Sequence, residues 1–92
     1  MDIKHTELET KGVFFIEMDG KTLAEMTYSK AGNDRIIIDH TEVGAELRGT
    51  GAGKKMVDAA VEYAREKKIS VIPLCSFARS VFDKTPAYKD VL

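Results

Sequence analysis

The sequence predicts a mixed fold of the α/β class, with α+β character, in which an antiparallel hairpin leads into a strand-helix-strand unit and helical segments close the chain. Three observations predict this fold. Two β-prone runs flank the pair Asp19-Gly20, a β-branched run is followed by a glycine-rich stretch, and apolar residues then recur at helical spacing. Strands combined with an amphipathic helix in this order favour a sheet with helices packed against it.

The hairpin is predicted over residues 11–18 and 21–29, because Asp-Gly suits the positive φ angles of a two-residue turn. The ideal register of such a turn sorts the apolar side chains into two faces. One face would carry Val13, Phe15, Ala24, Met26 and Tyr28, and the other Phe14, Ile16 and Leu23. Because both faces are partly apolar, we expect helices on at least one side of the sheet.

The remaining elements follow from periodicity and turn residues. Residues 35–43 are rich in β-branched side chains and predict a central strand, and residues 3–8 a short edge strand. The amphipathic helix would bury Met56, Val57, Ala60, Val61 and Ala64. A further strand is expected over residues 70–74 and a helix over 76–84, with Phe77 and Phe82 in the core. Thr85-Pro86 is typical of an N-cap before a short closing helix.

Length and composition restrict the class of protein. A chain of 92 residues predicts a single domain, residues 1–92, since a smaller second unit could not keep its own core. A net charge of −1 predicts no bulk attraction to nucleic acid or to an anionic membrane. The apolar runs are too short for a transmembrane helix and the N-terminus lacks a secretory pattern, so we expect a cytoplasmic protein. The single cysteine and two histidines show no metal-ligand spacing, so no metal is expected.

The glycine-rich stretch from Arg48 to Gly53 lies between a predicted strand and a predicted helix. Free N–H groups and the positive end of the helix dipole converge at such a position and favour an anion, in particular a phosphorylated ligand. Arg48 and Lys54 add local positive charge. The spacing excludes a P-loop and a dinucleotide-binding G-x-G-x-x-G motif. The alternative is that these glycines only shape the turn.

Arg48-Gly49-Thr50-Gly51-Ala52-Gly53 resembles the (Gln/Arg)-x-x-Gly-x-(Gly/Ala) signature of the GNAT acetyltransferases. More narrowly, the residues around His40–Val43, Glu46–Gly49, Pro73–Phe77 and Pro86–Tyr88 look like the small YjdJ-type branch of that superfamily. The resemblance spans residues 13–92. Ordinary members of the family place helices between their first two strands, and these help to build the acceptor pocket. Only a short segment precedes the hairpin here, so the resemblance predicts the acyl donor better than the acceptor.

The resemblance implies a mixed sheet whose central strands separate into a V-shaped cleft for acetyl-CoA. The pantetheine arm would run beside the main chain of Glu42 and Val43, and the thioester would point toward Cys75. Main-chain amides would hold the pyrophosphate. These amides would come from Leu47, Arg48, Gly49, Thr50, Gly51, Ala52, Gly53 and Lys54.

Three side chains are candidates for catalysis. Cys75 lies where a strand meets a helix, and the positive end of the helix dipole there would favour a nucleophilic thiolate; a buried, inert cysteine is the alternative. His40 is a candidate general base or a structural histidine, and alternation places Glu42 on the same face. Tyr88 could protonate the leaving thiolate, as a tyrosine does in many GNAT enzymes, or could serve in packing.

The sequence thus predicts an N-acetyltransferase that uses acetyl-CoA and an unidentified amine acceptor, by direct transfer or through acetyl-Cys75. The alternative is a non-catalytic sensor of acetyl-CoA or CoA, or a protein-interaction module. Neither nucleic acid nor a membrane is an expected partner. The sequence indicates no oligomeric state.

Overall fold

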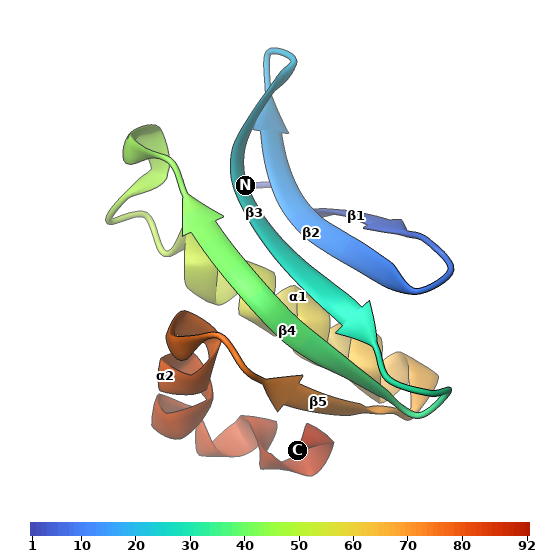
Figure 1. Cartoon of the computed structure of the whole chain (residues 1–92). Helices are drawn as coiled ribbons and strands as arrows, with labels where there is room; N and C mark the ends of the chain where they lie inside the picture. Colours follow the sequence, from blue (N-terminus) through green and yellow to red (C-terminus); the bar gives the residue numbers. More distant parts are fainter.

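A five-stranded mixed sheet in the order β1-β2-β3-β4-β5 is the framework of the computed structural model, which describes residues 1–92 (Figure 1). The elements in chain order are β1 (Lys4–Glu7), β2 (Lys11–Met18), β3 (Lys21–Lys30), β4 (Arg35–Val43), the 3₁₀ helix η1 (Ala45–Leu47), α1 (Ala52–Lys67), β5 (Ser70–Pro73), α2 (Ser76–Lys84) and the 3₁₀ helix η2 (Pro86–Val91). The mixed sheet with helices confirms the predicted fold class.

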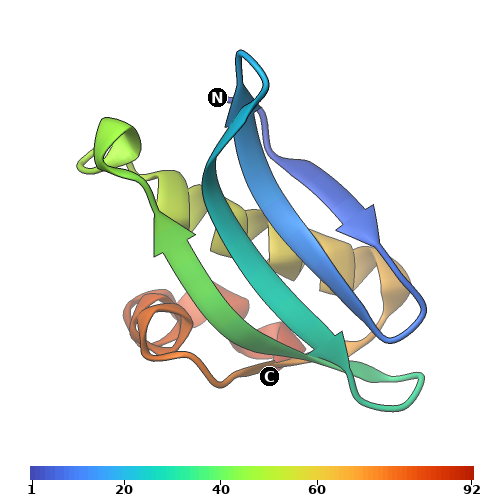
Figure 2. The same ribbon diagram turned by 45° about the horizontal axis from the view of Figure 1, so that its top comes forward.

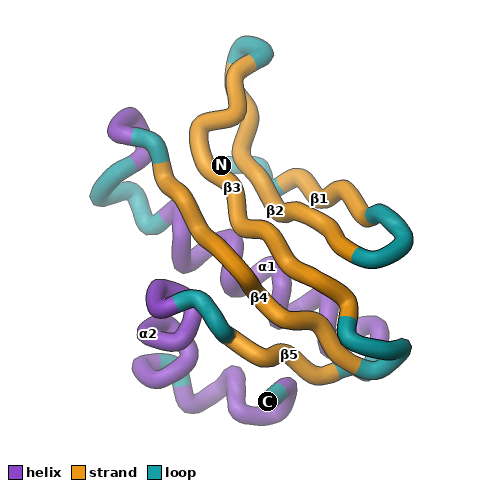
Figure 3. The backbone as a smooth tube through the Cα atoms, in the orientation of Figure 1, coloured by secondary structure: helices purple, strands orange, loops and turns teal.

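The strands β1 to β4 are antiparallel to their neighbours, whereas β4 and β5 are parallel. The first four need only short turns between them, as the backbone tube shows (Figure 3). A parallel pair needs a crossover, and α1 supplies it between β4 and β5. No helix of the structure is long and apolar enough to span a membrane.

The predicted faces of the hairpin are wrong, because β3 contains a bulge at Leu23. Ile16 pairs with Ala24 and Glu17 with Thr22, so Leu23 has no opposite residue. One extra residue moves every later side chain of β3 to the other face. The buried face therefore combines Phe14 and Ile16, rather than Val13 and Phe15, with Ala24, Met26 and Tyr28.

Helices cover only one face of strands β1 to β4. Figure 2 shows α1 behind these strands, and α2 and η2 pack against α1 near the β5 edge. The apolar side of α1 buries Met56, Val57, Ala60, Val61 and Ala64, as its periodicity predicts. Twenty buried residues form one core cluster between this helix layer and the sheet. The other face of β1 to β4 has no helix over it (Figures 1 and 2).

A second bulge, in β4, determines how the central strands separate. Thr27 pairs with His40 and Tyr28 with Ile38, which leaves Asp39 unpaired. The parallel pairing of β4 with β5 ends at Ile38 and Pro73, and the N–H of Cys75 donates to the Ile38 carbonyl at 3.0 Å as the final link. Beyond that point β4 has a free edge on the β5 side.

The closing segment after α2 is a 3₁₀ helix, and its predicted side-chain N-cap is absent. Thr85 makes no capping hydrogen bond with its side chain. Its N–H instead donates to the Phe82 carbonyl at 3.2 Å, and its carbonyl accepts from the N–H of Tyr88 at 2.9 Å. Tight main-chain turns thus join α2 to η2 without a side-chain cap.

Candidate functional site

The turn before α1 needs glycine at two positions because of its backbone geometry. Gly49 has φ 78° and Gly51 has φ 81°, a left-handed region that side chains with a Cβ rarely adopt. A Cβ added at either residue would have nothing within 4 Å. The main chain of this turn is therefore open to a ligand, and packing does not explain these two glycines.

Main-chain N–H groups without an acceptor gather at the same turn. The N–H of Thr50 donates to the Leu47 carbonyl at 3.2 Å and that of Lys55 to the Gly51 carbonyl at 3.0 Å. The groups that donate no hydrogen bond within the chain are those of Gly49, Gly51, Ala52, Gly53 and Lys54. Together with the dipole of a 16-residue helix they form a site that favours an anion.

A cleft of about 430 Å³ begins at this turn and continues between β4 and α2. Basic side chains line it from three elements of the chain: Arg48 before α1, Lys54 in its first turn and Lys84 at the end of α2. None of the three has an acidic partner in an ion pair. The cleft therefore offers uncompensated positive charge beside the free N–H groups.

The free edge of β4 forms one wall of the cleft. The N–H of Gly44 donates to the Leu23 carbonyl at 2.7 Å, so Gly44 and, by alternation, Glu42 direct their main-chain groups toward β3. Thr41 and Val43 direct theirs toward the β5 side. The main chain of Val43 is thus free on the β5 side, whereas that of Glu42 is engaged by β3, so Thr41 and not Glu42 is the second residue with free main-chain groups there.

Cys75 is the N-cap residue of α2 and lies half-buried at the point where β4 and β5 separate. Its Sγ accepts a hydrogen bond from the N–H of Ala78 at 3.4 Å and lies 3.3 Å from Oγ1 of Thr41. Sequence reasoning did not assign Thr41 to the site. The one signal in the sequence is that Thr41 shares a face of its strand with Val43. The contact between Thr41 and Cys75 could not be predicted, because it depends on where β5 ends.

Phe77 lines the cleft and is not the core residue that its spacing predicts, since its side chain is 40% exposed. Its ring lies against the start of α1, where a Cβ on Gly53 would come within 2.4 Å of the ring. Gly53 therefore differs from Gly49 and Gly51, because close packing requires it. Leu47 and Ala52 are buried beneath the turn, and the exposed Thr50 bonds with its hydroxyl to the Leu47 carbonyl.

His40 and Glu42 lie on the opposite side of β4 from the cleft. Their side chains are 66% and 69% exposed and approach each other to 3.7 Å, on the sheet face that no helix covers. The predicted sharing of a face by these two residues is confirmed. Neither side chain lines the cleft.

Tyr88 is buried and contacts α1 instead of Cys75. Its hydroxyl donates to Asp58 at 2.6 Å, its ring packs against Phe82, and Lys54 Nζ lies 5.6 Å from the ring centroid. Burial, followed by the bond to Asp58, raises the pKa of Tyr88 to about 12. This arrangement indicates a packing role and holds the proton on the phenol.

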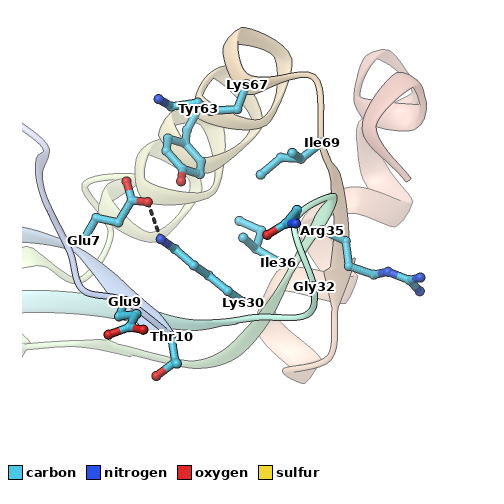
Figure 4. A pocket seen from close by; sticks show the side chains of 11 residues that line it. Glu7, Glu9, Thr10, Lys30, Gly32, Arg35, Ile36, Tyr63, Lys67 and Ile69 are labelled. Atoms are coloured by element: carbon cyan, nitrogen blue, oxygen red, sulfur yellow. Dashed lines mark hydrogen bonds and ion pairs between the residues drawn. The ribbon is translucent and has the colours of Figure 1, made fainter.

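Another hollow, of about 470 Å³, lies at the far end of the sheet near the C-terminus of α1 (Figure 4). Figure 4 shows Lys30 directed toward Glu7, with Tyr63 above them and Arg35 turned away. The Lys30 ammonium lowers the pKa of Glu7 through their hydrogen bond. Glu7 and Glu9 line this hollow beside its basic side chains, and Lys30 is paired with Glu7, so its charge is mixed and not uniformly positive as in the cleft.

Comparisons with known proteins agree with this geometry. A family model described as GCN5-related N-acetyl-transferase matches residues 13–91. A GCN5-like protein from Staphylococcus aureus, proposed to be an N-acetyltransferase, is 44% identical, with a TM-score of 0.74 over 98% of this chain and 85% of that one. The chain therefore belongs to the GCN5-related N-acetyltransferase (GNAT) family and to the acetyl-transferring enzymes. Its membership of the YjdJ-type branch stays a prediction.

More distant structures share the fold. A protein from Clostridium acetobutylicum, predicted to be an acetyltransferase and crystallised with acetyl-CoA, is 20% identical, with a TM-score of 0.65 over 82% of this chain and 56% of that one. The ribosomal-protein-alanine N-acetyltransferase of Brucella melitensis biovar Abortus 2308 is 19% identical, with a TM-score of 0.64 over 82% and 60%. The chain thus spans little more than half the length of these two proteins.

Proposed function

We propose that this protein binds acetyl-CoA in the cleft between β4 and α2 and transfers the acetyl group to a primary amine. The observation that carries the proposal is the set of free N–H groups at the turn before α1, next to uncompensated basic side chains. Phosphate is the ligand chemistry that best satisfies such an arrangement. CoA also carries an extended arm and a thioester, for which the free edge of β4 at Val43 and the half-buried Cys75 thiol, where β4 and β5 separate, are available.

The residues of the cleft fit the successive parts of this donor. The free N–H groups of Gly49 and of residues 51–54, with the side chains of Arg48 and Lys54 beside them, would hold the pyrophosphate. The free main chain of Thr41 and Val43 would hydrogen-bond the amides of the pantetheine arm, as a neighbouring strand does. Phe77 would cover the apolar part of the arm. When bound, acetyl-CoA supplies an activated acyl group at the end of that arm.

Cys75 would act on that acyl carbon, and the Thr41 hydroxyl, 3.3 Å from its Sγ, would position the thiol. In the covalent route, a bond forms between the Cys75 sulfur and the acetyl carbon, and the bond between that carbon and the CoA sulfur breaks. The proton of the Cys75 thiol passes to the departing CoA sulfur. The acceptor nitrogen then bonds to the same carbon, the bond to Cys75 breaks, and one amine proton returns to the Cys75 sulfur. In direct transfer, the cleft acts by positioning alone. The proposal gives Tyr88 no part in proton transfer.

The test combines calorimetric titration with acetyl-CoA and intact mass measurement of the same protein sample. We expect binding of the intact protein, and Cys75→Ala separates the two routes because the variant keeps the turn and the strand edge. A mass increase of one acetyl group that is absent from Cys75→Ala supports the covalent route. Unchanged amine acetylation by Cys75→Ala excludes it.

Thr41→Val is the matched second variant, since it removes the hydroxyl 3.3 Å from Sγ and keeps the branched shape. In the covalent route we expect slower acetylation of Cys75 with little change in acetyl-CoA affinity. No detectable binding of acetyl-CoA at millimolar concentration would contradict the proposed function. Binding without transfer to any amine in a broad panel would favour a CoA sensor.

A further inference from the structure

The cleft extends beyond the residues to which the proposed function gives a role. Ser80, Lys84 and Thr85 also line it, and we call these three residues the α2 wall. Ser80 and Lys84 follow Phe77 at helical spacing, so all three lie on the same side of α2. The pyrophosphate, the arm and the thioester of the donor are placed elsewhere in the proposed function, which leaves the α2 wall unused.

The α2 wall lies at the opposite end of α2 from the thiol. Cys75 is the N-cap residue of this helix and Lys84 is its last residue, about 13 Å away along the helix axis. Tyr88 joins this end of α2 to the start of α1. Its N–H donates to the Thr85 carbonyl at 2.9 Å, and its hydroxyl lies 3.5 Å from Lys54 Nζ. The α2 wall is therefore near the anion-binding end of the cleft.

The α2 wall offers a free cation and hydroxyl groups to a ligand. Lys84 forms no ion pair, and the side chain of Thr85 makes no capping hydrogen bond. No acidic side chain lines the cleft. Asp83, the neighbour of Lys84 in α2, lies outside its lining, and Asp58 of α1 accepts the hydrogen bond of the Tyr88 hydroxyl at 2.6 Å. This surface thus favours an anion with several acceptor oxygens.

CoA carries such an anion in addition to its pyrophosphate. A phosphate monoester is attached to the 3′ position of its ribose, and the pyrophosphate separates this group from the arm and the thioester. A phosphate monoester has three acceptor oxygens and a charge of about −1.5 to −2 at neutral pH. When the thioester is near Cys75 and the pyrophosphate is at the turn before α1, the 3′-phosphate must lie at the end of the cleft away from the thiol. Lys84 is the cation of the cleft that has no phosphate assigned to it.

We propose that the α2 wall binds the 3′-phosphate of CoA and that Lys84 determines the preference for donors that carry this group. The proposal rests on the proposed function and adds a specificity determinant to its donor site. The Lys84 ammonium pairs with the phosphate monoester, and the hydroxyls of Ser80 and Thr85 donate to its remaining oxygens. Because these contacts are at the opposite end of α2 from Cys75, they affect the affinity for the donor and not the transfer step.

Calorimetric titration with CoA and with 3′-dephospho-CoA, under reducing conditions, measures the contribution of this phosphate. The ratio of the two affinities is the decisive quantity, because effects on the pyrophosphate cancel in it. We expect the unchanged protein to bind CoA about five- to tenfold more tightly than 3′-dephospho-CoA. K84Q should reduce this preference to about twofold or less. The control is K55Q, which removes the same charge from an exposed lysine next to Lys54 that does not line the cleft, and it should keep the preference.

Phosphorus NMR of bound CoA provides a second readout, which a change in packing alone would not alter. A cation beside the 3′-phosphate favours its doubly charged form. The pKa of the 3′-phosphate should therefore be lower in the complex with the unchanged protein, or with K55Q, than in free CoA. In the complex with K84Q it should return toward the value of free CoA.

Two results would overturn the proposal for the α2 wall. One is equal affinity of the unchanged protein for CoA and 3′-dephospho-CoA, and the other is the same preference in K84Q as in the unchanged protein. Either result with clear binding of both ligands leaves the proposed function intact. Absence of binding by both ligands at millimolar concentration contradicts the proposed function and the α2 wall together.

Discussion

At the scale of single residues, glycines of one sequence motif have different physical roles. Gly49 and Gly51 are required for their positive φ and lie beside open space, whereas Gly53 is required because the Phe77 ring occupies the place of a Cβ. Gly20 provides a matched comparison, since it also has positive φ and open surroundings but lies in the hairpin turn.

Gly51→Glu should weaken acetyl-CoA binding by about tenfold or more, because it places a carboxylate where phosphate would approach the main chain. Gly20→Glu should leave the affinity unchanged. Both substitutions should lower the free energy of unfolding by a similar amount, about 1–2 kcal/mol, since both force a side chain into the left-handed region. Calorimetric titration and urea denaturation of the two variants provide the measurements. Equal CoA affinity of the two would contradict the phosphate placement.

At the scale of elements, the residue that follows the last turn of α1 adopts a conformation that a lysine disfavours. Lys68 adopts φ 59° and ψ 46°, and its N–H donates to the carbonyls of Ala64 and Arg65. This is the left-handed C-terminal turn that glycine usually provides. Relief of the strain in Lys68→Gly is partly offset by the greater freedom of glycine in the unfolded chain, so we expect stabilisation of about 0.5 kcal/mol.

Lys67→Gly is the control, because it removes the same charge from the last helical residue. It should destabilise by about 1 kcal/mol, the usual effect of glycine within a helix. For a domain of this size, thermal denaturation should show Lys68→Gly melting about 2–4 °C higher and Lys67→Gly about 4–8 °C lower than the unchanged protein. A lower melting temperature for Lys68→Gly would show that the left-handed residue is not under strain.

At the scale of the whole molecule, the edge strand β1 contacts the helix α1 through the side chains of His5 and Tyr63. The His5 ring stacks on Phe14 with a centroid separation of 4.1 Å, bonds to the Tyr28 hydroxyl at 2.6 Å and meets the edge of Tyr63. Burial of the ring lowers the pKa of His5 below its ordinary 6.5; Glu7 opposes this effect and Lys30 adds to it.

The lowered pKa gives a definite sign to the pH dependence of stability. Between the folded and unfolded pKa values the unfolded chain binds more protons at His5, so the free energy of unfolding falls as the pH drops through about 6.5. In His5→Gln, the free energy of unfolding should fall less steeply between about pH 7 and pH 5. Glu7 titrates below this range, because Lys30 lowers its pKa. Urea denaturation at several pH values tests it. Equal slopes for the two proteins would exclude His5 as the source.

Much of the fold could be predicted because local signals agree with the tertiary structure. Asp19-Gly20 has the turn conformation that its composition favours, with φ 52° and 78°. The apolar period of α1 matches its buried side, and the predicted strand over residues 35–43 coincides with β4. Each of these features depends on residues close together in the chain, so their pattern was visible in one sequence.

The sequence by itself determined the order of the elements, the glycine-rich turn and therefore a place for an anion. The tertiary structure alone decided the register, since the bulges at Leu23 and Asp39 depend on how strands pair and leave no mark in alternation. It also decided that Thr41 meets Cys75 and that Phe77 lines the cleft while Tyr88 turns to Asp58. The contacts of Thr41 with Cys75 and of Asp58 with Tyr88 join residues about 30 or more positions apart, and the first also depends on where β5 ends. Local sequence patterns carry no information about such long-range contacts.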